Sequence, residues 1–116
     1  MSSINYDGRR FVSVSNSGTG EVDSTTVFHY HQEGRLVWAT YRGGAIRFGT
    51  LIANLEEGDC LNMRYQHCNT AGELMTGQCR STPEVLSDGR VRLYEVWQWT
   101  SGDFSQGESV IEEVRD

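Results

Sequence analysis

The sequence contains no lysine, and all ten basic residues of the 116-residue chain are arginine. This absence excludes Schiff-base catalysis, a phosphate-loop lysine and a lysine general base. Sixteen acidic residues leave a formal net charge of −6. Because the basic residues are outnumbered and form no cluster, this balance argues against nucleic acid or an anionic membrane as a partner.

Long hydrophobic runs are also missing. The first residues, MSSINYDGRR, lack the apolar core of a signal peptide, and no run approaches the length of a membrane span. We therefore expect a cytoplasmic protein that makes no membrane contact. The cysteines Cys60, Cys68 and Cys79 are odd in number and show no C-x-x-C spacing. We expect reduced thiols rather than a disulfide framework or a zinc site.

Glycine is abundant, with 13 residues against a single proline. Turn pairs such as Gly43-Gly44 and Asp88-Gly89 recur at a short, even spacing between β-rich segments. We predict strands over residues 10–16, 25–32, 35–42, 45–54, 60–68, 73–81, 90–100 and 107–115, with a short extra strand near 4–6. Pro83 falls in a stretch that we expect to be irregular, between two of these strands.

The short connections allow only antiparallel pairing between neighbouring strands. About eight such strands in series would leave two exposed edges unless the sheet closes on itself. The expected fold class is therefore all-β, with one domain over residues 1–116. We predict an antiparallel up-and-down β-barrel, with a β-sandwich as the alternative.

Alternation along the strands indicates which side chains face the barrel interior. In the segment 90–100 the more apolar set is Val91, Leu93, Glu95, Trp97 and Trp99. Applied to the other strands, the same reasoning predicts an interior of Phe28, Tyr30, Trp38, Met63, Tyr65, Leu93, Trp97 and Trp99, with His67 and Glu95 among them. This face carries more polar groups than a fully packed core, and more aromatic residues than a solvent-exposed surface. A small barrel has room either for packed side chains or for one small ligand.

Five segments that cover most of the chain form a distinctive set: FHYHQEG (28–34), VWATYRGG (37–44), RYQHCNTAGELMTG (64–77), STPEVLSDGR (81–90) and WQWTSGDFSQGESVIEE (97–113). They resemble a group of short bacterial proteins of about this length, often catalogued as N-acetylglutamate synthases. The resemblance implies a compact β-barrel of calycin (lipocalin-like) or avidin type. An acetyl-CoA-dependent synthase needs a glycine-rich turn between a strand and a helix. The chain has no such unit, which argues against that activity.

The aromatic interior suggests a ligand pocket, because aromatic side chains supply area and shape while a few polar groups fix a ligand's orientation. The predicted ligand-binding residues are Tyr30, Trp38, Tyr65, His67, Glu95, Trp97 and Trp99. The leading hypothesis is a barrel that binds a small, partly aromatic or hydrophobic molecule and uses no cofactor.

Two alternatives remain open. In the first, the barrel is a cofactor-free enzyme of isomerase or lyase type, with His67 and Glu95 as acid and base and no cysteine on the apolar face. In the second, a filled barrel acts through self-association. A homodimer could then form through an exposed sheet face that contains Val37, Ala39 and Tyr41.

The pair His29 and His31 shares one face of a strand, as two ligands of a metal ion often do. Both histidines face outward if the aromatic residues between and beside them face inward, so we predict no metal site. Near the C-terminus, the segment GESVIEEV is the expected closing strand, with Glu112 or Glu113 in solvent.

Overall fold

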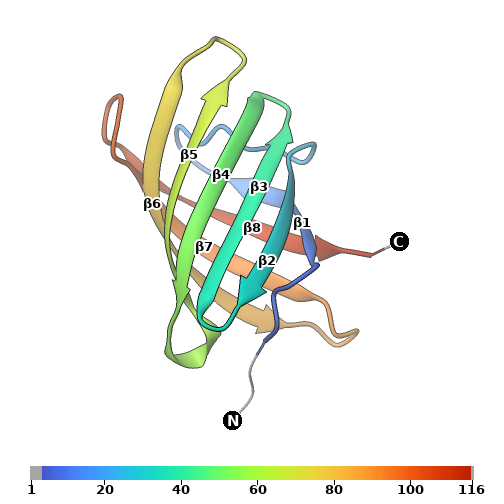
Figure 1. The fold of residues 1–116 in the computed structure, drawn as a ribbon. Coiled ribbons are helices and arrows are strands. Elements are labelled where there is room, and N and C mark those ends of the chain that lie inside the picture. Colours follow the sequence, from blue (N-terminus) through green and yellow to red (C-terminus); the bar gives the residue numbers. More distant parts are fainter. Residues whose placement is uncertain (1–3, 116) are drawn as a thin grey trace.

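The chain folds into a closed barrel of eight antiparallel strands that follow one another in sequence order, as Figure 1 shows for the computed structural model. The structure describes residues 4–115. The strands are β1 (Arg10–Asn16), β2 (Val27–Glu33), β3 (Leu36–Gly43), β4 (Ile46–Leu55), β5 (Leu61–Asn69), β6 (Leu74–Val85), β7 (Val91–Trp99) and β8 (Gln106–Val114). A short 3-10 turn, η1 (Glu57–Asp59), lies between β4 and β5.

The predicted up-and-down barrel is confirmed, and the sandwich alternative is wrong. The strand ends differ from the predicted ones by at most two residues in all strands but β6. Residues 4–6 form no strand. Within residues 4–115 no helix has the length and apolar character needed to cross a membrane.

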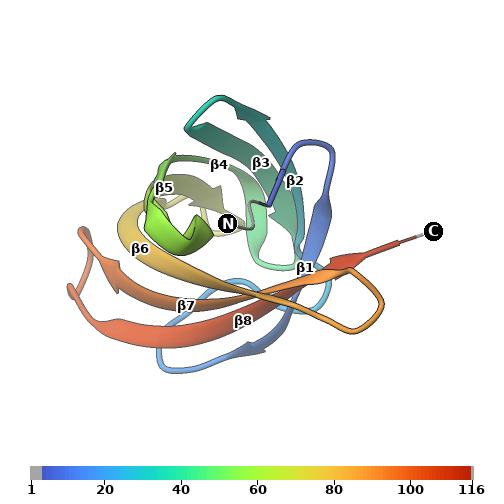
Figure 2. The same cartoon turned by 90° about the horizontal axis from the view of Figure 1, so that it is seen from below.

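Pairing between the first and last strands closes the barrel. β1 and β8 run antiparallel from the pair Arg10–Val114 to the pair Asn16–Ser109, with a bulge between Ser13 and Ser15. Figure 2, a view along the barrel, shows the strands arranged as a ring. Every strand therefore pairs with a neighbour on each side over at least part of its length, which leaves only short unpaired stretches at strand ends.

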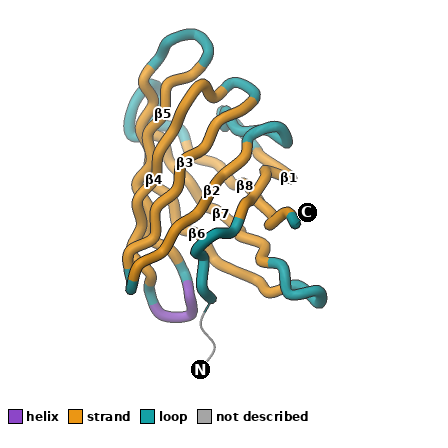
Figure 3. The backbone as a smooth tube through the Cα atoms, turned by 45° about the vertical axis from the view of Figure 1, so that its right-hand side comes forward, coloured by secondary structure: helices purple, strands orange, loops and turns teal. Residues whose placement is uncertain are grey.

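The first described residues, from Ile4 onward, cover one end of the barrel. Tyr6 is fully buried there, and its hydroxyl donates a hydrogen bond to the carbonyl of Asp59 at 2.7 Å. The backbone N–H of Tyr6 donates to Gln32 Oε1 at 2.8 Å. Figure 3 shows this first segment beside the η1 turn at the same end. Since Tyr6 and Ile4 fill this end, free space inside the barrel lies toward the other one.

The predicted orientation of side chains is confirmed on β2 and β7, where Phe28, Tyr30, Trp97 and Trp99 are buried. It is wrong on β3. Trp38 lies outside and is 37% exposed, whereas the buried residues of this strand are Val37, Ala39 and Tyr41. These three residues therefore form no exposed face for self-association.

The neighbouring strand decides the orientation of β3. Ala39 pairs with the inward-facing Tyr30, and Trp38 pairs with the outward-facing His31. The His31 and Trp38 rings stack outside the barrel, with centroids 5.5 Å apart. Because β3 carries apolar side chains on both faces, its own composition could not fix which face is inside.

Two further residues lie where the sequence analysis did not place them. Pro83 lies within β6, beyond Ser81, the last residue of β6 that pairs with β5. A proline is tolerated there because the strand has a ladder partner on one side only. Cys79 is buried and faces the interior beside Trp97, so a cysteine does lie on the apolar face.

Of the two glutamates of which one was expected in solvent, Glu112 is partly exposed, whereas Glu113 points into the barrel and is 6% exposed. Its carboxylate accepts a hydrogen bond from Arg9 at 2.7 Å and another from the backbone N–H of Val91 at 3.0 Å. A buried carboxylate is stable only when such partners replace its lost hydration. The chain supplies them at the end of the barrel that its first residues cover.

Candidate functional site

A cavity of about 50 Å³ lies inside the barrel, toward the end opposite the chain start. Its wall includes Asn16 and Trp99, the last residues of β1 and β7. Gly20, Glu21 and Val22 of the loop between β1 and β2 also line it, so this loop lies over the mouth.

Five aromatic rings line the cavity, and they belong to Phe28, Tyr41, Tyr65, Trp97 and Trp99. The apolar side chains of Leu51 and Met63 also line it. The Trp97 and Trp99 ring centroids are 5.7 Å apart at an interplanar angle of 58°. Tyr65 meets Trp99 at 5.8 Å and 65°. Rings at such steep angles line the cavity from different directions, whereas parallel rings would stack on one another.

Three of these rings lie opposite glycines on the next strand. Tyr65 pairs with Gly77 and Trp97 with Gly107, and Tyr41 pairs with Gly49 in the same way. A Cβ atom on Gly107 would lie 2.5 Å from a carbon of the Trp97 ring, and one on Gly77 would meet the Tyr65 ring. The absence of a side chain at each position lets the opposing ring lie over the neighbouring backbone.

Glu95 faces the cavity from the middle of β7. Its carboxyl group accepts hydrogen bonds from Ser81 Oγ at 2.9 Å and Ser109 Oγ at 3.2 Å. Burial raises its pKa from the ordinary 4.5 to about 7, and the two serine hydrogen bonds oppose part of that increase. Its protonated and ionised forms are therefore close in free energy at neutral pH.

A chain of hydrogen bonds connects the loop at the mouth to the wall. Glu21 Oε1 lies 2.8 Å from His67 Nε2, and His67 Nδ1 lies 3.0 Å from the Tyr41 hydroxyl. Asn69 Nδ2 donates to both oxygens of Glu21, and Trp99 Nε1 donates to Thr19 Oγ1 at 3.0 Å. These contacts hold the loop over the cavity.

Five of the seven residues predicted to bind a ligand line the cavity: Tyr65, His67, Glu95, Trp97 and Trp99. Tyr30 is fully buried but packs below the cavity, beside Tyr6 and Phe11. Trp38 is outside the barrel and takes no part in it.

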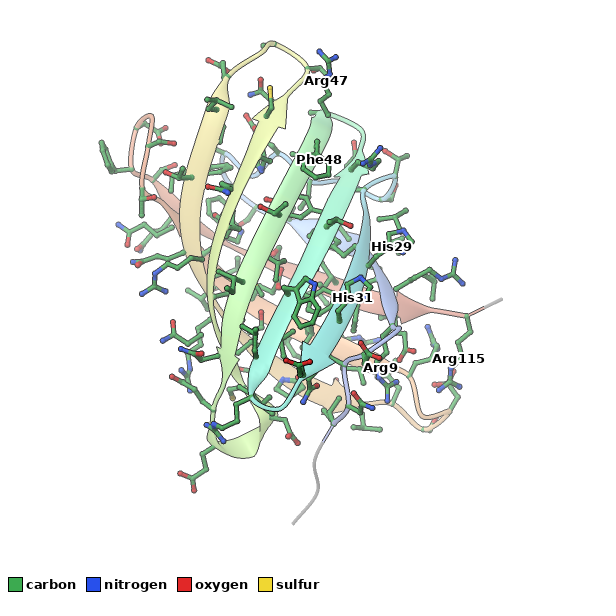
Figure 4. All side chains as sticks on the ribbon, viewed as in Figure 1. Arg9, His29, His31, Arg47, Phe48 and Arg115 are labelled. Atoms are coloured by element: carbon green, nitrogen blue, oxygen red, sulfur yellow. The ribbon has the colours of Figure 1, made fainter. Side chains whose placement is uncertain are left out.

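His67 and Glu95 both face the cavity, yet each makes its hydrogen bonds with other residues. Their predicted role as a catalytic acid and base stays a prediction. His29 and His31 point away from the barrel, as Figure 4 shows.

The residues predicted from the sequence do not include Glu21, the two serines that contact Glu95, or the glycines opposite the aromatic rings. Glu21 lies in a loop, where no periodic pattern points to a site. The glycines could have been noticed, because glycine inside a strand marks a close approach of another group.

Comparison with known proteins agrees with this architecture. A family model described as avidin-like protein matches residues 4–114. The chain belongs to the avidin-like protein family. No curated protein and no solved structure matches it. The avidin-like assignment confirms the barrel type that the resemblance implied and is consistent with small-molecule binding inside the barrel.

Replacing Gly77 with alanine tests whether the glycines shape this avidin-like cavity. We expect Gly77→Ala to lower the free energy of unfolding by about 1–3 kcal/mol, because the added methyl group overpacks the Tyr65 ring. In a Tyr65→Ala background the same substitution is expected to cost almost nothing, since the ring is absent. Urea unfolding of the four proteins of this double-mutant cycle measures the coupling. Additive effects of the two substitutions would contradict the proposed contact.

The raised pKa of Glu95 predicts how stability depends on pH. Because the folded-state pKa is about 7 and the ordinary value is 4.5, stability is full below pH 4.5 and falls as the pH rises to about 7. From pH 5 to pH 8 this group should remove about 2–3 kcal/mol. We expect Glu95→Gln to abolish that component in urea unfolding at the two pH values.

Glu108→Gln is the matched control, because Glu108 is an exposed carboxylate on β8. This variant should keep the pH dependence of the wild-type protein. A pH dependence in Glu95→Gln identical to that of the wild-type protein would show that the pKa of Glu95 is not raised in the folded state.

Proposed function

We propose that this avidin-like barrel binds a small molecule in its cavity, held by the aromatic wall and oriented by Glu95. The observation that carries the proposal is the position of Glu95, whose carboxyl group lies in a wall made mostly of apolar side chains. A packed core gains nothing from such a group, since its desolvation is unfavourable. Apolar walls with a few well-placed polar groups are typical of ligand sites.

The size of the cavity limits what it can hold. Pockets for drug-sized molecules enclose about 300–1,000 Å³, whereas this one encloses about 50 Å³. A ligand that fits wholly inside is therefore compact, and a larger one would place only its head group there. The remainder would extend past the β1–β2 loop.

The polar contacts available to a ligand are few. Both ring nitrogens of His67 are already occupied by Glu21 and Tyr41. His67 therefore shapes the wall. Glu95, Ser109 and Asn16, whose Oδ1 atom has no hydrogen-bond partner among residues 4–115, provide the polar contacts that orient a bound head group.

Native mass spectrometry of the protein purified from the organism that encodes it tests this proposal, because it detects any tightly bound molecule by its mass. We expect the wild-type protein to carry a small added mass. Trp97→Leu removes a wall residue, and the loss of its ring contacts should weaken binding at least about tenfold, so that the added mass is lost.

Trp38→Leu is the matched control, because Trp38 lies on the outer face of the barrel. It should retain the added mass at the wild-type level. Absence of added mass from the wild-type protein, or its equal retention in Trp97→Leu, would contradict binding in this cavity.

A further inference from the structure

The charged groups around the cavity are mainly negative. Glu95 lies in its wall and Glu21 at its mouth, and among residues 4–115 no arginine lines it. The chain also contains no lysine. His67, the basic side chain present, has its Nε2 atom directed at the Glu21 carboxylate. The potential inside the cavity therefore favours a positive group over a negative one.

The two inward-facing carboxyl groups of Glu95 and Glu113 differ in their partners. Glu113 is paired with the guanidinium of Arg9 at 2.7 Å. Glu95 receives hydrogen bonds from two neutral serine hydroxyls and faces the cavity. An ionised carboxylate at such a depth needs a positive partner to offset its desolvation. Arg9 is this positive partner for Glu113. For Glu95, a positive group bound in the cavity would take the same role.

The wall beside Glu95 is also suited to a cation. The faces of tryptophan and tyrosine rings carry negative electrostatic potential and attract ammonium groups. Tyr65, Trp97 and Trp99 meet at interplanar angles of 58° and 65° around one side of the cavity. Aromatic cages that recognise methylated ammonium groups are built from rings set at an angle to one another, and these three rings would supply one side of such a cage.

The volume agrees with a compact head group. A cavity needs about 10–15 Å³ to hold one water molecule, which has a single non-hydrogen atom. The cavity volume of 50 Å³ therefore holds about three to five non-hydrogen atoms. A nitrogen with its methyl groups has this size. Below the cavity, the fully buried hydroxyl of Tyr30 has no hydrogen-bond partner among residues 4–115. Burial raises the pKa of this hydroxyl, and the nearby Glu95 is a smaller cause of the same increase.

We propose that the cavity binds the head group of a small alkylammonium compound, with Glu95 as its counter-ion and Tyr65, Trp97 and Trp99 as its aromatic walls. This inference rests on the proposed function and specifies the ligand class. The ammonium group enters past the β1–β2 loop, and the rest of the molecule extends toward the mouth.

The titration of Glu95 makes this binding pH-dependent. The groups that face Glu95 are Ser81, Ser109, Tyr30, Tyr41, Tyr65 and Cys79, with His67 and Glu21 nearer the mouth. Burial raises the pKa values of the three tyrosines and Cys79, so these groups stay neutral near pH 7. A cation binds the ionised form of Glu95, whose pKa is about 7. Affinity therefore rises with pH, and binding near pH 7 releases a proton.

Three probes of similar shape and different charge test the inference by isothermal titration calorimetry. They are choline, its neutral isostere 3,3-dimethyl-1-butanol, and the anion 3,3-dimethylbutanoate. At pH 8 we expect choline to bind at least tenfold more tightly than the alcohol and the anion to bind weakest. Choline affinity should fall by up to about a hundredfold between pH 8 and pH 5. Titrations near pH 7 in buffers of different ionisation enthalpy should reveal the released proton.

Two variants with the same change of charge separate the contribution of Glu95 from that of net charge. Glu95→Gln should abolish the preference for choline over the alcohol, and Glu108→Gln should retain it. Equal binding of the three probes, no binding of choline, or a preserved choline preference in Glu95→Gln would overturn the inference. If native mass spectrometry then still shows an added mass that Trp97→Leu loses, the proposed function stands and only the ligand class is wrong.

Discussion

Closure of the sheet is the constraint on which the rest of the structure depends. Once β8 pairs with β1, alternate side chains of every strand must share one narrow interior. At the end covered by the chain start, Tyr6, Phe11 and Tyr30 fill this space. At the other end, aromatic rings lie over glycines on the next strand. This arrangement packs the rings against the wall and leaves a small cavity between them.

The two inward-facing carboxyl groups, one near the covered end of the barrel and one in the cavity wall, differ in the partners that stabilise them. Near the covered end, Glu113 is neutralised by Arg9, so it serves to hold the first residues against the closing strand. In the cavity, Glu95 has neutral hydrogen-bond donors and a raised pKa. A protein that needed Glu95 only for stability would gain from a hydrophobic residue at this position. The position of this carboxyl group beside an aromatic cavity therefore supports the proposed binding of a ligand.

Much of the fold could be predicted from the sequence, because the turn signals and the alternating strands all favour one closed antiparallel sheet. The orientation of β7 was also predictable, since Glu95, Trp97 and Trp99 share one face. Trp38 could not be placed, because β3 is apolar on both faces and only pairing with β2 decides its orientation. The role of Glu21 was hidden for another reason, namely that its contact with His67 joins a loop to a distant strand.

The Glu95 carboxyl group lies in the interior, where burial shifts its proton equilibrium. Carbon-13 NMR titration of the glutamate side-chain carboxyl groups measures this shift, with Glu95→Gln used to assign the resonance. A midpoint at about pH 7 is expected for Glu95. A midpoint near the ordinary value of 4.5 would contradict it, because the carboxyl group would then be as well solvated as one on the surface.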